Sequence, residues 1–273
     1  MINPNNKTFR FMVHDILSKS TTMSENSINS WLELAKTVDY NDACVELKKR
    51  AKKKKGSLVS YAKRRAKSKA RAISIGKNET DSNENIILLD IGTEDPFIFD
   101  ELVNSYGLKY KNLHAINVRM YEGTNYGLLP EDTSKLKFNF KWYDGKKIPY
   151  NDNTFDIVSL FMVFHHIPYT EQQSFIAEIH RVMKKRGRLI IKEHDIKNKT
   201  SLNIIKFEHV IYDKILEEEN DGDFTPENIY GRSKRKLIEL FTDNNRFKLL
   251  HHTKVSNNYK AYNRSFYMTL EKT

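Results

Sequence analysis

The hydrophobic pattern of the chain changes about a third of the way along. In the first part, apolar residues recur at helical spacing through residues 9–16 and 28–34, which predicts two amphipathic helices. The stretch 48–71 carries apolar residues between its many charges, and we expect it to be helical with a break at Gly56. Residues 76–84 are polar and rich in turn formers, so they predict a linker.

From residue 85 onward, short apolar runs alternate with helical patterns. The run 86–91 is continuously apolar apart from one acid, as expected for a strand buried on both faces of a parallel sheet. The predicted strands are 86–91, 113–118, 138–142, 155–164, 188–192, 247–255 and 264–271, and the predicted helices are 97–106, 170–183, 200–219 and 233–244.

This alternation predicts an α/β fold with a Rossmann-like, doubly wound sheet of seven strands. The sheet should be mostly parallel. The last two strands lack a helix between them, so we expect an antiparallel strand at the C-terminal end. The expected organisation is a helical, basic N-terminal extension with its linker over residues 1–84, followed by one α/β domain over residues 85–273.

The net charge of +11 comes from one segment. Of the 46 Lys and Arg residues, thirteen lie between Lys48 and Arg71 with no acid among them, so the other 33 stand against 35 acidic residues. A segment of this kind predicts a surface that binds phosphates, and we expect nucleic acid as a partner there. A solvated helix face or a partly disordered arm is the alternative.

Cysteine content and hydropathy limit the setting of the protein. The single cysteine, Cys44, excludes an intramolecular disulfide framework and a zinc site built from cysteines. No apolar run is long enough for a secretory signal or a membrane span. We therefore expect a cytoplasmic protein that does not enter a membrane.

Three blocks carry the candidate chemistry. They read LLDIG from residue 88, WYDGKKIPYNDNTFDIVSLFMVFHHI from residue 142, and EIHRVMKKRGRLIIKEHD from residue 178. Together they resemble a class I S-adenosylmethionine-dependent methyltransferase of the type-11 sort. The resemblance covers about residues 86–196, and its narrower features look closest to methyltransferase-like proteins of giant DNA viruses.

The resemblance implies a cofactor, S-adenosylmethionine, at the carboxyl edge of the sheet. Gly92 would let the backbone meet the amino-acid end of the cofactor, Asn117 would contact the ribose, and Asp144 would contact the adenine amine. The implied cofactor-binding residues are Asp90, Gly92, Thr93, Asn117, Asp144, Gly145 and Phe161.

Two positions depart from the pattern of this family. Glu94 stands where a second glycine is usual, and Asn117 stands where an acid usually accepts hydrogen bonds from both ribose hydroxyls. Each position also has a plain structural interpretation, as a core strand with its turn or as a strand-end turn former. Asp144 with Gly145 likewise suits an ordinary tight turn.

The candidate catalytic residues are His165, Glu193 and His194. His165 leaves the fourth strand, where methyl donor and acceptor would meet, and its ordinary pKa lies near neutrality. In the family this position is often structural instead. Three ionisable residues after the fifth strand, Glu193, His194 and Asp195, are costly to bury without a role. We expect no metal, because methyl transfer needs none and the spacing matches no familiar metal motif.

These observations predict an S-adenosylmethionine-dependent methyltransferase with RNA or another polyanion as acceptor. A small-molecule or sugar acceptor is one alternative. A non-catalytic subunit with a degenerate cofactor site, which binds nucleic acid or a partner, is an alternative of another class. Residues 197–231 are expected to cover the acceptor side of the cleft, although their composition carries no substrate signature.

Overall fold

The computed structural model describes residues 2–77, 82–118, 129–130, 132–216, 224–225 and 228–273. The chain forms two compact units. We call Met1–Leu58, His194–Ser233 and Val255–Ser265 the helical unit, and Val59–Glu193, Lys234–Lys254 and Phe266–Thr273 the sheet unit. None of the described helices is long and apolar enough to span a membrane.

The helical unit contains α1 (Lys7–Ser20), α2 (Glu25–Leu34), α3 (Tyr40–Arg50) and α7 (Lys199–Val210), which continues as a π-helical segment over Ile211–Leu216. Polar side chains cap the helix starts; for example, Asn198 and Ser201 form a capping box at the start of α7. The last three residues of the predicted helix 200–219 lie outside the described residues.

Aromatic side chains form the core of the helical unit. The ring of Phe207 in α7 lies 5.1 Å from that of Phe9 and stacks at 6.0 Å on that of Trp31. The Trp31 indole donates a hydrogen bond to the Ala43 carbonyl at 2.8 Å. Residues 199–216, part of the stretch 197–231 that was expected to cover the acceptor side, therefore pack with the N-terminal helices, and Phe207 is fully buried in this core.

The sheet unit is built on seven strands in the order β3-β2-β1-β4-β5-β7-β6. Their bounds are β1 Leu88–Ile91, β2 Leu113–Val118, β3 Asn139–Tyr143, β4 Phe155–Phe161, β5 Met183–His194, β6 Phe247–His252 and β7 Ser265–Lys272. The first five strands pair in parallel, and β6 and β7 pair antiparallel. The predicted fold class is confirmed.

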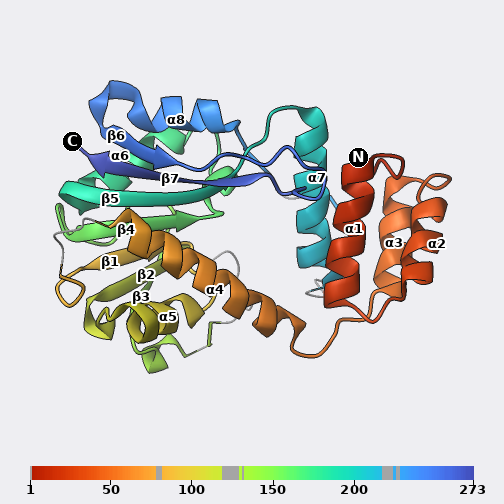
Figure 1. Cartoon of the computed structure of the whole chain (residues 1–273), viewed down its shortest axis with the longest axis horizontal. Coiled ribbons are helices and arrows are strands. Elements are labelled where there is room, and N and C mark those ends of the chain that lie inside the picture. Colours follow the sequence, from red (N-terminus) through yellow and green to blue (C-terminus); the bar gives the residue numbers. More distant parts are fainter. Residues whose placement is uncertain (1, 78–81, 119–128, 131, 217–223, 226–227) are drawn as a thin grey trace. The chain divides into compact units, whose positions relative to one another are not determined.

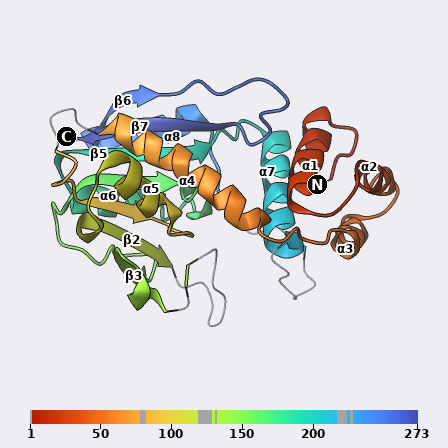
Figure 2. The same ribbon diagram turned by 60° about the horizontal axis from the view of Figure 1, so that its bottom comes forward.

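Helices cover both faces of this sheet. On one face lie α4 (Ser57–Gly76) and α5 (Phe97–Tyr106), which share a core with Ile157, Phe161 and Ile190 of the strands (Figures 1 and 2). Phe164, in the turn after β4, contacts both Phe175 of α6 (Gln172–Val182) and Phe241 of α8 (Lys234–Thr242), and Phe241 also contacts Phe247 of β6. Short 3-10 turns occupy Tyr110–Asn112, Thr133–Lys135, Phe164–His166 and Asp243–Asn245.

The basic segment divides between the two units. Gly56, at φ +74°, separates α3 from α4, as the sequence predicts. Close packing fixes the end of α4 on the sheet, because a Cβ at Gly76 would lie 2.8 Å from the Ile190 side chain and 3.2 Å from the Thr269 hydroxyl. The compact units consequently divide at residues 58–59, whereas the sequence pattern placed the boundary at residues 84–85.

Candidate functional site

The candidate site lies at the carboxyl ends of β1 and β4. β1 and β4 are neighbours in the sheet; the connection after β1 leads to β2 on one side, and the connection after β4 leads to β5 on the other side, so the two connections leave in opposite directions. In open α/β sheets, such a switch point creates the crevice in which ligands bind. The turn after β1, residues 92–96, and the residues that follow β4 therefore face the position where a ligand is expected.

Gly92 makes the turn after β1 possible. Its φ of +76° is left-handed, and an added Cβ would lie 2.3 Å from Cγ2 of Val163, which follows β4. Its N–H donates to the Ile116 carbonyl at 2.8 Å, which continues the pairing of β1 with β2. A side chain is therefore excluded here by both the backbone conformation and the close approach of Val163.

Asp90 and Thr93 shape the same turn from within. The Asp90 carboxylate accepts hydrogen bonds at 2.6 Å from the hydroxyls of Ser159 and Thr93, and all three side chains are buried. Burial raises the pKa of Asp90. Two of the predicted cofactor-binding residues thus act on each other, and their side chains hold the turn that presents Gly92.

The acids of the turn engage different partners. Asp95 is buried and accepts a hydrogen bond from the Phe97 N–H at 3.1 Å, at the start of α5. Glu94 is half-exposed, and its carboxylate lies 3.8 Å from the guanidinium of Arg65 on α4. The bulky residue in place of the second glycine is therefore directed toward a cation on α4.

Asn117 connects the ends of β1 and β2. Its amide nitrogen donates to the Thr93 carbonyl at 2.9 Å, and its amide oxygen accepts from the Val118 N–H at 2.9 Å. Each end of the side chain thus has one protein partner already. This supports the structural interpretation and leaves only the remaining hydrogen-bonding capacity for a ribose.

Asp144 forms a tight turn with Gly145 after β3. One carboxylate oxygen, Oδ1, accepts from the N–H groups of Lys146 and Lys147 at 2.8 and 3.1 Å. These bonds lower the pKa of Asp144. Gly145 has φ +78°, as such a turn requires. Within the described part of the chain, Oδ2 accepts no hydrogen bond, so it can still meet a donor such as the adenine amine.

The turn after β4 is tied to the end of β5 by a buried pair. Nδ1 of His165 lies 2.6 Å from Oε1 of Glu193, and the His165 N–H donates to Oε2 at 3.2 Å. Both residues are about 1% exposed. Phe161, the last residue of β4, is also buried. The structure thus brings two of the three catalytic candidates into direct contact.

The third candidate, His194, belongs to the helical unit. Its Nδ1 lies 2.7 Å from the Asn263 carbonyl. The neighbouring Asp195 is buried, and its carboxylate lies 3.5 Å from the Arg264 guanidinium. These contacts anchor the segment that follows β5 to the loop before β7.

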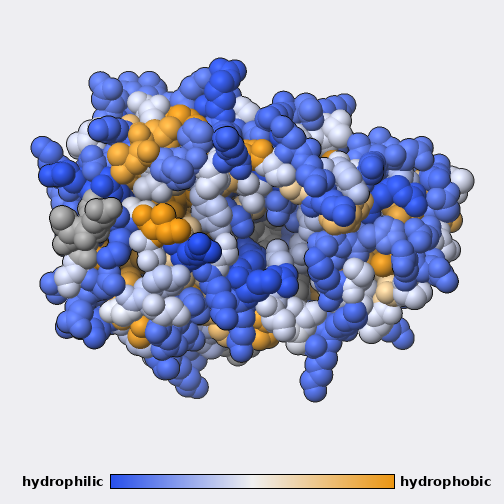
Figure 3. Space-filling model, viewed as in Figure 1, coloured by the Kyte–Doolittle hydropathy of each residue, from blue (hydrophilic) through white to orange (hydrophobic). Residues whose placement is uncertain are grey.

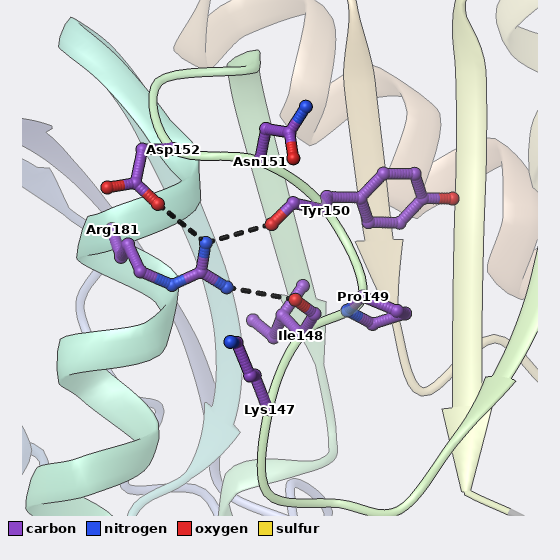
Figure 4. Close-up of a pocket in the computed structure, with 7 residues that line it drawn as sticks. All are labelled: Lys147, Ile148, Pro149, Tyr150, Asn151, Asp152 and Arg181. Atoms are coloured by element: carbon purple, nitrogen blue, oxygen red, sulfur yellow. Dashed lines mark hydrogen bonds and ion pairs between the residues drawn. The ribbon is translucent and has the colours of Figure 1, made fainter.

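A shallow pocket of about 540 Å³ lies along the loop between β3 and β4 (Figure 4). Arg181 of α6 lines this pocket and makes most of the polar contacts there. The guanidinium donates to the carbonyls of Ile148 and Tyr150 at 2.9 and 2.8 Å and pairs with Asp152 and Glu178. These partners occupy the guanidinium. The contacts of Arg181 therefore anchor the loop between β3 and β4, and we assign no ligand to this pocket.

Comparisons with known proteins agree with the fold. Residues 122–191 match a family model described as a methyltransferase domain, Methyltransf_11, which covers less than half of the chain. A search of curated protein sequences gives no match.

Two solved structures show the similarity over most of the chain. One is a chain of the complex between the Haloferax volcanii Trm112 methyltransferase activator and its methyltransferase, with a TM-score of 0.54, 12% identity, and coverage of 80% of this chain and 94% of that one. The other is a Burkholderia thailandensis 1,6-didemethyltoxoflavin-N1-methyltransferase, with a TM-score of 0.50, 14% identity, and coverage of 92% and 91%. The chain therefore has the fold of S-adenosylmethionine-dependent methyltransferases.

Sequence reasoning missed one buried charged residue, Lys69 on α4, whose ammonium lies 5.7 Å from the centre of the Phe161 ring at the end of β4. It lies on the buried side of the helix, with Ala66, Ala70 and Ile73. The signal was present, because residues 66, 69, 70 and 73 share one helical face. The density of charge in the segment concealed it.

Proposed function

We propose that the sheet unit binds S-adenosylmethionine and transfers its methyl group to a polyanionic acceptor such as RNA. One observation carries the cofactor assignment. The glycine turn lies at the switch point of the sheet, where Val163 leaves no room for a side chain at residue 92. The matched methyltransferase segment and the fold support the same cofactor.

The residues around the turn suit this cofactor. Gly92 opens the backbone for the amino-acid end, and Oδ2 of Asp144 can accept from the adenine amine. The cofactor supplies a methyl group on a sulfonium, so the protein mainly has to align the acceptor.

A base is needed only when the acceptor loses a proton on methylation. An ionised Glu193 would hold His165 with its proton on Nδ1, which makes Nε2 the basic nitrogen. The same pair would clamp the turn after β4 in a purely structural role.

The acceptor assignment rests on the outer face of α4. Lys63, Lys67 and Arg71 are exposed and lie four residues apart, so they form one stripe along the helix. The described residues place no carboxylate within ion-pair distance of this stripe. The space-filling view shows a mostly hydrophilic surface over α4 (Figure 3). Such a stripe is suited to follow a phosphate backbone.

A small-molecule acceptor is the second candidate. The Burkholderia thailandensis enzyme was solved with 1,6-didemethyltoxoflavin and S-adenosylhomocysteine bound, and the similarity to it spans most of both chains. In this case the basic stripe serves a purpose other than acceptor binding. The narrower similarity to viral proteins stays a prediction.

Calorimetry with S-adenosylhomocysteine tests the cofactor, and binding at micromolar to millimolar ligand is expected. RNA binding is then measured against salt for the full chain and for a variant with Lys63, Lys67 and Arg71 changed to Gln. Loss of three phosphate contacts should make the negative slope of log K against log salt shallower by about 2 to 3.

A variant with Lys109, Lys111 and Lys135 changed to Gln removes three exposed charges elsewhere on the sheet unit and should leave that slope nearly unchanged. Equal slopes for both variants would exclude the stripe as the acceptor surface. RNA binding without any cofactor binding would instead favour a non-catalytic subunit.

A further inference from the structure

Lys69 is a buried cation beside the glycine turn. Its side chain lies on the inner side of α4 and is 5% exposed. The ammonium is 5.7 Å from the centre of the Phe161 ring, at the carboxyl end of β4. Among the residues that the structure describes, none accepts a hydrogen bond from this ammonium or lies within 4.0 Å of it as an ion-pair partner.

The acids of the turn attract Lys69 without satisfying its donors. Asp90, Glu94 and Asp95 all favour its charged form, whereas burial and the nearby Arg65 lower its pKa, burial being the larger cause. Asp90 already accepts from two hydroxyls, and Asp95 accepts from a backbone N–H. A Lys ammonium has three hydrogens to donate, and in the described part of the chain no protein acceptor uses them, so they are available to an anionic ligand that enters the site.

Lys69 lies near the part of the turn where Glu94 replaces the second glycine. A second glycine would let the backbone approach the carboxylate of an amino-acid ligand, and here Glu94 adds a negative charge instead. Arg65 lies near the Glu94 carboxylate, at 3.8 Å. A cation placed deeper than Arg65 would offset the repulsion between the acidic turn and a bound carboxylate.

We propose that Lys69 donates hydrogen bonds to the carboxylate at the amino-acid end of the cofactor and thereby replaces the anchoring that the second glycine would allow. This inference rests on the proposed function, because it requires the cofactor to bind at the turn after β1. It makes α4 part of the cofactor site through its inner face. The competing explanation is that Lys69 serves only as an internal counter-ion for Asp90 and Asp95.

A pair of ligands isolates the carboxylate. Calorimetry compares S-adenosylhomocysteine with its decarboxylated analogue, S-adenosyl-3-thiopropylamine, which lacks only that group. We expect the full chain to prefer S-adenosylhomocysteine by about 10- to 100-fold, as a charge-assisted hydrogen bond in a buried site would give. In Lys69→Met the preference should fall to about one, while affinity for the decarboxylated analogue stays within a few-fold.

Arg64→Met is the matched control, because it removes an exposed cation from the same helix and should keep the preference. If Lys69→Met does not fold, Lys69→Gln fills similar space and allows the same comparison. A counter-ion role alone would lower the melting temperature of the Lys69 variants and leave the ligand preference intact, and that result overturns the inference. If neither ligand binds the full chain, the proposed function itself fails.

Discussion

Two acidic loops leave the same edge of the sheet, and they are stabilised in different ways. In the turn after β1, Asp90 and Asp95 are buried and attract a cation from α4, about twenty residues earlier in the chain. In the loop after β3, Asp144 is exposed and bonds to the amides of its own turn. Further along, Arg181 fastens that loop from α6.

The difference shows what burial demands of an acid. An exposed carboxylate needs only nearby N–H groups, which any tight turn supplies. A buried carboxylate must find hydroxyls and a cation inside the protein, which ties the turn to other elements. The turn after β1 should therefore tolerate substitution poorly, and the start of the loop after β3 should tolerate it well.

The largest effect is expected from Gly92→Ala. The substitution adds a Cβ that overlaps Val163 and places alanine at a positive φ, so we expect a loss of about 2–4 kcal/mol in the free energy of unfolding. Urea denaturation measures it. Gly107→Ala is the matched control, because its φ is +72° and nothing lies within 4 Å of the added Cβ.

The control should lose only about 1–2 kcal/mol, which is the cost of the backbone conformation alone. Adding Val163→Ala to Gly92→Ala should restore part of the difference. Equal losses at Gly92 and Gly107 would show that the contact with Val163 is not restrictive, and the comparison of the two loops would lose its main support.

A smaller effect is expected from Arg181→Ala. Two carbonyls of the loop after β3 lose their donor, so we expect a loss of about 2 kcal/mol in the free energy of unfolding. Arg235→Ala breaks an exposed pair with Glu239 on α8 and should change stability by less than about 1 kcal/mol. A loss at Arg181 no greater than at Arg235 would contradict the anchoring role.

The ion pair between Arg181 and Glu178 predicts a pH dependence of stability. A hydrogen bond from Arg181 lowers the pKa of Glu178, so the stabilisation is present above the ordinary pKa of Glu, 4.5, and is lost as pH falls through the lowered value. The deficit of Arg181→Ala relative to the full chain should be complete at pH 7 and should narrow in acid. Urea denaturation at a series of pH values measures it, and a deficit that widens in acid would contradict this sign.

The sequence predicted the central strands of the sheet well, because β1 and β4 are short apolar runs between turn formers, and the final hairpin followed from the missing helix. It also predicted the turn at Gly92 after β1 and the turn at Asp144 after β3, whereas the roles of these residues in a ligand site stay predictions. It was harder to predict which residues of the basic segment are buried. A run of lysines looks exposed to solvent until the helical face of each residue is considered. Lys69 shows the consequence.

The packing of α7 on the N-terminal helices was also beyond the sequence pattern. Phe207 contacts Phe9 and Trp31, which lie far away along the chain, and no local signal reports such a contact. For the same reason the pattern could not separate Glu193 from His194. They are adjacent in sequence, yet one pairs with His165 in the sheet unit and the other with Asn263 in the helical unit.

The smallest effect on stability is expected from Asp144→Asn. Asn keeps an oxygen that can accept from the amides of Lys146 and Lys147, so the turn should survive and the urea midpoint should barely move. Affinity for S-adenosylhomocysteine should nevertheless fall by about 10-fold, because an amide replaces the charged acceptor for the adenine amine. Asp132→Asn is the matched control, since Asp132 is also exposed and accepts from the Ser134 N–H. If both variants bind the ligand equally well, Asp144 is only a turn former, and the loop after β3 contributes no contact to adenine.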